Sequence, residues 1–256
     1  RMSEKWKHFN KRKKQYSIIA VTGIIVILSV LLVFLIYSDK KSIEPVTNTV
    51  KTTNSTTIVP KPTEEPTTTM DFSELKGINS EVFAYINIPG TNIDYPIIYD
   101  ENEYYLNRTI EGEYDYHGTL FVQHYNTNTF KDKNTIIYGH NLIDNTMFSQ
   151  LHKYEDEQFF AEHKEIHIYI EGKNLTYQIF AAFQFTDVHI MYQYKFENNE
   201  QMQDFLTDAK DIGTQMIWDE SVKIKEDDCI ITLSTCANGN QPKNRWLVLA
   251  VLNRED

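Results

Sequence analysis

The feature of this chain that most constrains its fold is a series of short apolar segments with the two-residue period of β-strands. Ile93, Tyr95, Ile97 and Tyr99 alternate along one such segment, as they would in a half-buried strand. Further strands are predicted at 118–123, 135–138, 165–170, 175–185, 229–236 and 245–252. Because no regular alternation of strand and helix runs through these segments, a mainly β chain folded as a closed or nearly closed barrel is favoured over a doubly wound sheet.

Helices are predicted to interrupt this β pattern in three places. Apolar residues between 72 and 86 recur at mostly helical spacing, so one or two short helices broken at Gly77 are expected there. Residues 147–162 are a candidate helix pair, and residues 200–212 form one long amphipathic helix. Its apolar positions follow the i, i+3, i+4, i+7 pattern: Met202, Phe205, Leu206 and Ala209. A hairpin turn is expected at 171–174.

The region before residue 71 differs in composition from the rest of the chain. Residues 17–37 are uncharged and apolar, long enough as a helix to cross a bilayer, although a cleaved signal peptide is the alternative. The basic residues of 1–16 place that end in the cytoplasm. Residues 38–70 are rich in Thr and Pro and are expected to be a disordered tether. The sequence thus predicts a single-pass membrane anchor and an extracellular folded domain over 71–256.

The charge balance bears on possible partners. The chain has 25 Lys and Arg against 36 Asp and Glu, with a formal net charge of −11, and most of the acidic residues follow residue 70. Nucleic-acid binding is disfavoured, because phosphate contacts need clustered basic side chains.

The chain has two cysteines, Cys229 and Cys236, on one predicted strand. Seven residues of extended chain place them about 23 Å apart on opposite faces, so they cannot form a disulfide. Cys236 ends the strand just before the turn-forming Asn238, where a substrate could reach its thiol. The alternative is a small core residue, which is how most free cysteines behave. One cysteine is therefore predicted to be inert core and the other a nucleophile.

A thiol needs a neighbouring base or cation to become a nucleophile. His140 follows the strand at 135–138, in the same position relative to its strand as Cys236. Arg245 opens the last strand; an Arg there often only extends to solvent, but antiparallel pairing of the two last strands would bring it beside Cys236. A zinc site at His163 and His167 is not expected, because further ligands at metal spacing are missing. No cofactor is expected.

These residues resemble the signature of the class B sortases. The resemblance rests on Thr232-Leu233-Ser234-Thr235-Cys236, on Arg245 nine residues later, and on Tyr138-Gly139-His140-Asn141. Similar segments occur at 87–96, 105–107, 118–121 and 145–148. The resemblance implies a closed β-barrel of about eight strands with N-terminal helices and one long inserted helix, preceded by a transmembrane helix in the membrane of a Gram-positive bacterium.

The resemblance also implies a reaction. A membrane-anchored cysteine transpeptidase would cleave a C-terminal sorting signal after Thr through a thioester on Cys236, with His140 moving protons and Arg245 holding the substrate oxygen. The acyl group would pass to an amine of a cell-wall precursor, either lipid II or a peptidoglycan cross-bridge. The residues implied to contact the substrate are Asn102, Leu106, Tyr138, Met191, Tyr192 and Ser234. Ala237 stands where some class B members have an acidic residue.

Three other readings of the sequence stay open. The enzyme could be a pilin polymerase that uses a lysine amine of another subunit. The domain could be a tethered binding module without catalytic activity, or a cysteine peptidase that releases its product to water. Asn238 could orient His140, although a turn-forming role for this Asn is the favoured interpretation.

Overall fold

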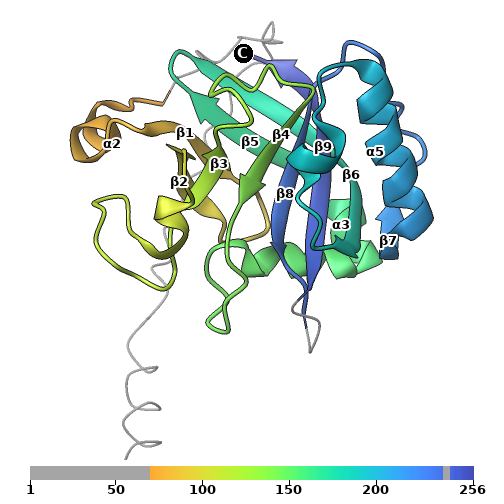
Figure 1. Ribbon diagram of the computed structural model, residues 1–256, viewed down its shortest axis with the longest axis horizontal. Coiled ribbons are helices and arrows are strands. Elements are labelled where there is room, and N and C mark those ends of the chain that lie inside the picture. Colours follow the sequence, from red (N-terminus) through yellow and green to blue (C-terminus); the bar gives the residue numbers. More distant parts are fainter. Residues whose placement is uncertain (1–69, 239–242) are drawn as a thin grey trace, which may run out of the picture. The chain divides into compact units, whose positions relative to one another are not determined.

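The computed structural model describes residues 70–238 and 243–256, shown in colour in Figure 1. The cytoplasmic tail at 1–16, the membrane helix at 17–37 and nearly all of the tether at 38–70 lie outside the described residues. Among the helices that are described, none has the length and apolar character needed to cross a membrane.

The described residues form one β-sheet with short helices around it (Figure 1). The strands are β1 (Val82–Asn87), β2 (Asp94–Asp100), β3 (Leu120–Gln123), β4 (Asn134–Tyr138), β5 (Glu165–Ile170), β6 (Lys173–Thr186), β7 (Thr214–Trp218), β8 (Ile230–Cys236) and β9 (Asn244–Glu255). The helices and 3-10 turns are α2 (Ser73–Ile78), η2 (Tyr104–Asn107), η3 (Phe148–Glu155), α3 (Glu157–Glu162), α4 (Ile190–Tyr194) and α5 (Asn199–Ile212).

The sheet closes into a barrel of eight strands. The strand order is β5-β1-β2-β3-β4-β8-β9-β6-β7, and an additional pairing of β5 with β6 closes the ring. β7 therefore lies outside the ring as an edge strand on β6. Two neighbouring pairs, β2 with β3 and β4 with β8, are parallel. The prediction of a mainly β closed barrel of about eight strands is confirmed.

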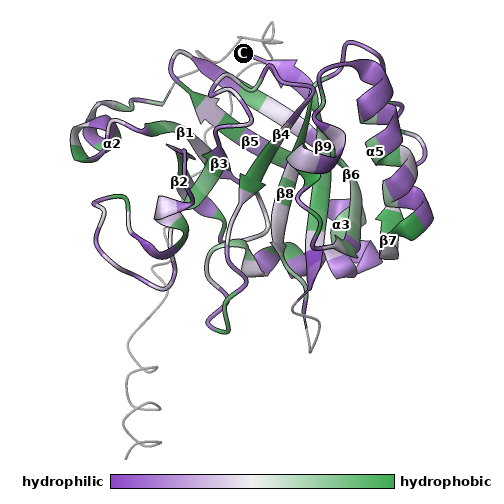
Figure 2. Cartoon of the chain, viewed as in Figure 1, coloured by the Kyte–Doolittle hydropathy of each residue, from purple (hydrophilic) through white to green (hydrophobic). Residues whose placement is uncertain are grey.

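Strands β8 and β9 are buried on both faces. Leu233 and Val248 belong to the cluster inside the barrel, whereas Ile230 and Leu249 belong to a second cluster that also holds the apolar face of α5. Figure 2 shows hydrophobic colour along the central strands and hydrophilic colour along much of α5. A strand covered on both sides reads as a continuous apolar run rather than an alternating one, as these two strands do.

Two predictions about the start of the domain were wrong. Gly77 lies inside α2 and does not interrupt it, and residues 82–87 form strand β1 rather than helix. Their burial alternates with a period of two, and β1 pairs with β2 on one side and β5 on the other. Ladder hydrogen bonds on both edges outweigh a local spacing that also fits a helix. The helix pair at 147–162 is present as η3 and α3, and the long helix as α5.

Candidate active site

Cys236 is the last residue of β8 and its only exposed one; the six residues before it are buried. Ser234 and Thr235 are nearly covered by neighbouring strands, with 4% and 2% of their surface exposed. Ala237 is buried again, and its N–H donates to the carbonyl of Asn244 at 3.1 Å. The barrel therefore presents one thiol at its rim, on a strand that its neighbours hold in place.

Arg245 lies directly across from Cys236. β8 and β9 are antiparallel, and their register pairs Cys236 with Arg245 and Thr235 with Trp246. The antiparallel pairing that the sequence left conditional is therefore confirmed. The Cα atoms of residues paired across neighbouring strands are about 5 Å apart. The side chain that carries the guanidinium group therefore starts beside the residue that carries the thiol.

His140 reaches the same rim from β4. The parallel strands β4 and β8 pair Tyr138 with Ser234, and the N–H of Gly139 donates to the Ser234 carbonyl at 3.2 Å. His140 and Cys236 each lie two residues further along. The Nε2 atom of His140 is 2.7 Å from the carbonyl oxygen of Leu106. Because a carbonyl only accepts, Nε2 carries the proton and Nδ1 is the nitrogen available for proton transfer.

Two side chains hold the main chain of Cys236: Asn141, in the loop after β4, and His152, in η3. Its carbonyl oxygen accepts from Asn141 Nδ2 at 3.0 Å and from His152 Nε2 at 2.9 Å. Asn238 bonds to Asn141 and to the Glu155 carboxylate, at 3.0 and 3.1 Å, rather than to His140. The residue that follows His140 in sequence thus bonds to the carbonyl of Cys236, which ties the two strand ends together.

The three residues share one cleft of about 280 Å³. It is lined by Cys236, His140 and Arg245 together with Leu106, Tyr138 and Ser234. Burial raises the pKa of Tyr138, Glu103 raises it further, and Arg245 opposes both. The phenol therefore stays neutral at the floor of the cleft.

The far wall of the cleft carries a polar chain that the sequence did not reveal. Gln123 donates to the Glu103 carboxylate at 2.8 Å, and its own carbonyl oxygen lies 2.9 Å from His189 Nε2. Burial lowers the pKa of His189, so the neutral imidazole donates from Nε2. Gln123 is a polar residue that ends an apolar strand, and that position could have drawn attention to it; no local pattern singles out His189.

Comparison with known proteins agrees with this geometry. A sortase domain family model matches residues 86–253. Over 167 residues the chain is 35% identical to Sortase B of Listeria monocytogenes, covering 65% of this chain and 67% of that protein. The chain belongs to the class B sortases. It is accordingly a cysteine transpeptidase.

Solved structures of other class B sortases have the same fold. A Staphylococcus aureus sortase B–substrate complex has a TM-score of 0.63 and 31% identity, covering 72% of this chain and 84% of the other. A Streptococcus pyogenes class B sortase involved in pilus biogenesis has a TM-score of 0.62 and 31% identity, covering 71% of this chain and 97% of the other.

Not every residue predicted to contact substrate lines the cleft of this sortase. Leu106, Tyr138 and Ser234 do. Asn102 is exposed beside the end of β2, where its N–H donates to Asp100 Oδ1 at 3.0 Å. Met191 is only 6% exposed and packs in the cluster beneath α5, whereas Tyr192 is 64% exposed on α4 with its hydroxyl bonded to that of Tyr125.

The second cysteine of the sortase lies just before β8, at the other end of the strand from Cys236. Cys229 is half-buried, and its thiol donates to the carbonyl of Lys131 at 3.5 Å. Burial raises the pKa of the thiol, which lowers its reactivity at neutral pH. The two cysteines are unpaired as predicted, but Cys229 lines a surface hollow and is not a core residue.

Proposed function

We propose that this sortase is a membrane-anchored transpeptidase that cleaves a C-terminal sorting signal after Thr and transfers the acyl group to an amine of a cell-wall precursor. The observation that carries the proposal is the meeting of Cys236, His140 and Arg245 in one cleft. A thiol, a proton-transfer group and a fixed cation are the parts that acyl transfer through a thioester requires.

In the acylation step, the Cys236 sulfur attacks the carbonyl carbon of the Thr residue. Negative charge then develops on the carbonyl oxygen, and the guanidinium of Arg245, on the strand directly beside Cys236, stabilises it by charge-assisted hydrogen bonding. Nδ1 of His140 takes the proton of the Cys236 thiol as the sulfur attacks, and it gives this proton to the leaving amine as the C–N bond breaks. The products are a thioester on Cys236 and the free C-terminal fragment.

The second step regenerates the thiol. An incoming amine attacks the thioester carbonyl, and His140 takes a proton from its nitrogen. The Cys236 sulfur leaves as the new amide forms, and His140 returns the proton to that sulfur. Nδ1 suits both transfers, because Nε2 is committed to the Leu106 carbonyl. That hydrogen bond gives Leu106 a role through its main chain, separate from any contact of its side chain with substrate.

The proposed placement follows from the sequence of the first 70 residues. The apolar run at 17–37 would anchor the chain, the basic residues before it would stay in the cytoplasm, and residues 38–70 would tether the catalytic domain outside the cell. Leu106, Tyr138 and Ser234 would contact the sorting peptide from within the cleft. Asn102, Met191 and Tyr192 would do so only if the bound peptide extended beyond it.

A second candidate function is pilin polymerisation, in which the attacking amine belongs to a lysine of another subunit. The similarity to the Streptococcus pyogenes class B sortase involved in pilus biogenesis favours it. Both candidates use the same acylation step and differ only in the amine.

The test is product analysis with the full chain in detergent. A peptide of the Asn-Pro-x-Thr type should give a thioester adduct on Cys236 by mass spectrometry, and added oligoglycine should convert the acyl group to an amide. Cys236→Ala should abolish the adduct, while the matched variant Cys229→Ala should form it at the normal rate. Turnover by Cys236→Ala would refute the proposal, and release to water whether or not the amine is present would indicate a peptidase.

A further inference from the structure

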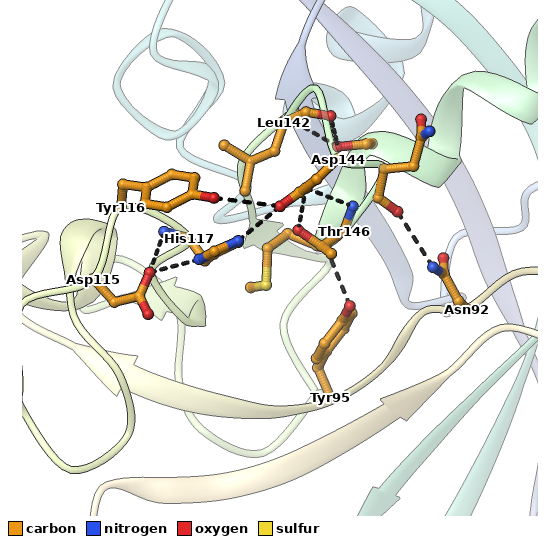
Figure 3. A network of polar contacts seen from close by, with 11 residues as sticks. Asn92, Tyr95, Asp115, Tyr116, His117, Leu142, Asp144 and Thr146 are labelled. Atoms are coloured by element: carbon orange, nitrogen blue, oxygen red, sulfur yellow. Dashed lines mark hydrogen bonds and ion pairs between the residues drawn. The ribbon is translucent and has the colours of Figure 1, made fainter. Parts of the chain in front are cut away.

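A second histidine, His117, lies close to the active site but outside the cleft. Figure 3 shows its ring between two carboxylates. Nδ1 is 2.6 Å from Asp115 Oδ1, and Nε2 is 2.8 Å from Asp144 Oδ2. Both contacts are partly exposed, with 31% of the His117 side chain accessible to solvent. The ring of Tyr116 lies against it, with the ring centroids 3.9 Å apart and the ring planes tilted by 35°.

The two carboxylates belong to different segments. Asp115 lies in the segment 108–119, between η2 and β3, whereas Asp144 lies in the loop 139–147, which begins directly after β4 and carries His140. The imidazole of His117 therefore links these two segments through its hydrogen bonds. We use the term His117 clasp for the three side chains Asp115, His117 and Asp144.

The residue after His117 connects the clasp to the active site. Gly118 has a φ of +64°, and a Cβ on it would lie 2.2 Å from the carbonyl oxygen of Leu106. That oxygen is the acceptor for His140 Nε2. These contacts and the chain form a closed ring. The main chain joins His140 to Asp144, and Asp144 bonds to His117. Gly118, next to His117 in sequence, packs against the Leu106 carbonyl, which bonds to His140.

Other hydrogen bonds hold the end of the loop 139–147, and they do not involve the Asp144 atom that faces His117. Asn92 donates to the carbonyl of Asn145 at 3.3 Å, and the N–H of Met147 donates to the hydroxyl of Tyr95 at 3.3 Å (Figure 3). Asp144 Oδ1 accepts from the N–H and the hydroxyl of Thr146. Asp144 Oδ2 is the atom that faces His117.

We propose that His117 is a positioning residue for the transpeptidation reaction, acting as a cationic clasp that fixes the Leu106 carbonyl and the His140 imidazole relative to each other. The inference rests on the proposed function of His140. His117 itself is not among the described residues that line the cleft.

The charge on His117 follows from its two partners. Both carboxylates are acceptors only, so each ring nitrogen must carry a proton to bond to both. The hydrogen bonds that His117 donates to Asp115 and Asp144 raise the pKa of His117, and bonds from Thr146 and His117 hold the pKa of Asp144 at about 2. The other titratable groups beside the ring are Tyr116, whose hydroxyl is 3.5 Å from Asp144, and Glu111 and Tyr95 in the adjoining hollow.

The direction of the pH effect is determined by these shifts. The folded pKa of His117 lies above its unfolded value of about 6.5, so the clasp is complete below that value and is lost as pH rises through the folded pKa. A neutral imidazole has one N–H and one lone pair, which would then face one of the carboxylates. The contribution of Asp144 is lost only in strong acid, near its folded pKa of about 2.

The first variant is His117→Gln in the full chain. A side-chain amide cannot donate in two opposite directions, so the clasp opens and turnover of a sorting peptide should fall by about fivefold to tenfold at about pH 6, because His140 loses its fixed orientation. The ratio of wild-type to variant turnover should shrink toward one as pH rises through the folded pKa of wild-type His117, because its ring then becomes neutral as well. A ratio that stays constant with pH, or shows no loss at all, would overturn the proposal.

The second variant is Asp144→Asn, which replaces the atom facing His117 by a donor while keeping the acceptor for Thr146. The new amide can donate to the lone pair of neutral His117, so the clasp should survive without its charge. Turnover relative to wild type should therefore rise between about pH 6 and about pH 9. A fall over the same range would contradict a charge-dependent clasp.

The control is His167→Gln, which changes another partly exposed histidine near a carboxylate, 3.8 Å from Glu165 on β5, and should leave turnover unchanged. A readout independent of substrate comes from NMR titration of the histidine rings. His117 should titrate above its ordinary range in the wild type, and the His140 Nε2 proton should shift in His117→Gln. If wild-type turnover is absent, the proposed function fails while these shifts still test the clasp; an unshifted His140 signal would overturn it.

Discussion

The two ends of strand β8 each carry a cysteine next to a surface hollow, and they differ in almost everything else. The hollow beside Cys229 is the larger, at about 500 Å³ against about 280 Å³ for the cleft at Cys236. Among the described residues that line the hollow at Cys229 there is no histidine and no arginine. At the other end, His140 and Arg245 reach the same rim as the thiol.

The difference teaches that strand pairing, and not the size of a hollow, brings a histidine and an arginine beside a thiol. Arg245 is brought to Cys236 by the register of β9, and His140 by the parallel register of β4. Cys229 instead has Lys133, Asp132 and Asp228 nearby, and burial raises the pKa of its thiol more than Lys133 lowers it. The chain places the same functional group in two settings, of which one can support nucleophilic catalysis.

The largest effects are expected from substituting the two residues that distinguish the surroundings of Cys236 from those of Cys229, which are His140 and Arg245. His140→Ala should lower turnover of a sorting peptide by about a thousandfold, the usual scale for a general acid–base group. Arg245→Lys keeps the charge but loses the planar donor pair, and we expect a loss of about a hundredfold. Steady-state kinetics with the full chain would measure both values.

The matched control for these two variants is Lys133→Gln, which removes a cation beside Cys229. Its turnover should stay within about twofold of wild type, the range expected for a surface change away from the site. A loss comparable to that of Arg245→Lys would mean that the charge of the domain as a whole, rather than the pairing of β8 with β9, determines activity.

A smaller effect is expected when the two thiols are compared directly. In single-cysteine variants, Cys236 (in Cys229→Ala) should react with iodoacetamide at least about tenfold faster than Cys229 (in Cys236→Ala) at about pH 7. The raised pKa of the Cys229 thiol leaves little thiolate at that pH, and the ratio should narrow as pH increases. Equal rates at neutral pH would favour the binding-module reading over catalysis.

Much of the fold could be predicted because the strands of this barrel have strong local patterns. Alternation predicts β2 and β5, whereas continuous apolar runs predict β8 and β9. The error at β1 arose because Val82, Phe83 and Ile86 fit both helical and strand spacing, and only pairing with β2 and β5 decides between them. β7 was missed because its residues are mostly half-exposed, with no buried face to generate a pattern.

Local sequence patterns also predict only part of the active site. The meeting of Cys236, His140 and Arg245 in one cleft could be predicted because each lies at or near one end of an apolar strand. The Leu106 carbonyl that orients His140 is a main-chain atom, and no side-chain pattern predicts it. Met191 and Tyr192, which the resemblance implies contact substrate, lie on α4, where Met191 faces the core. Contacts that depend on loop conformation are fixed by tertiary packing and leave little trace in local sequence.

The smallest difference between the two ends of β8 is in the groups that donate hydrogen bonds to the main-chain carbonyl of each cysteine. The Cys236 carbonyl accepts from the side chains of Asn141 and His152, whereas the Cys229 carbonyl accepts from the N–H of Leu252 at 3.0 Å. Asn141→Ala removes one of the side-chain donors, and we expect kcat to fall about fivefold with KM unchanged, because one lost hydrogen bond costs about 1 kcal/mol. If KM rose while kcat held, Asn141 would instead contact the substrate, and the two ends of the strand would differ in binding rather than in support of the nucleophile.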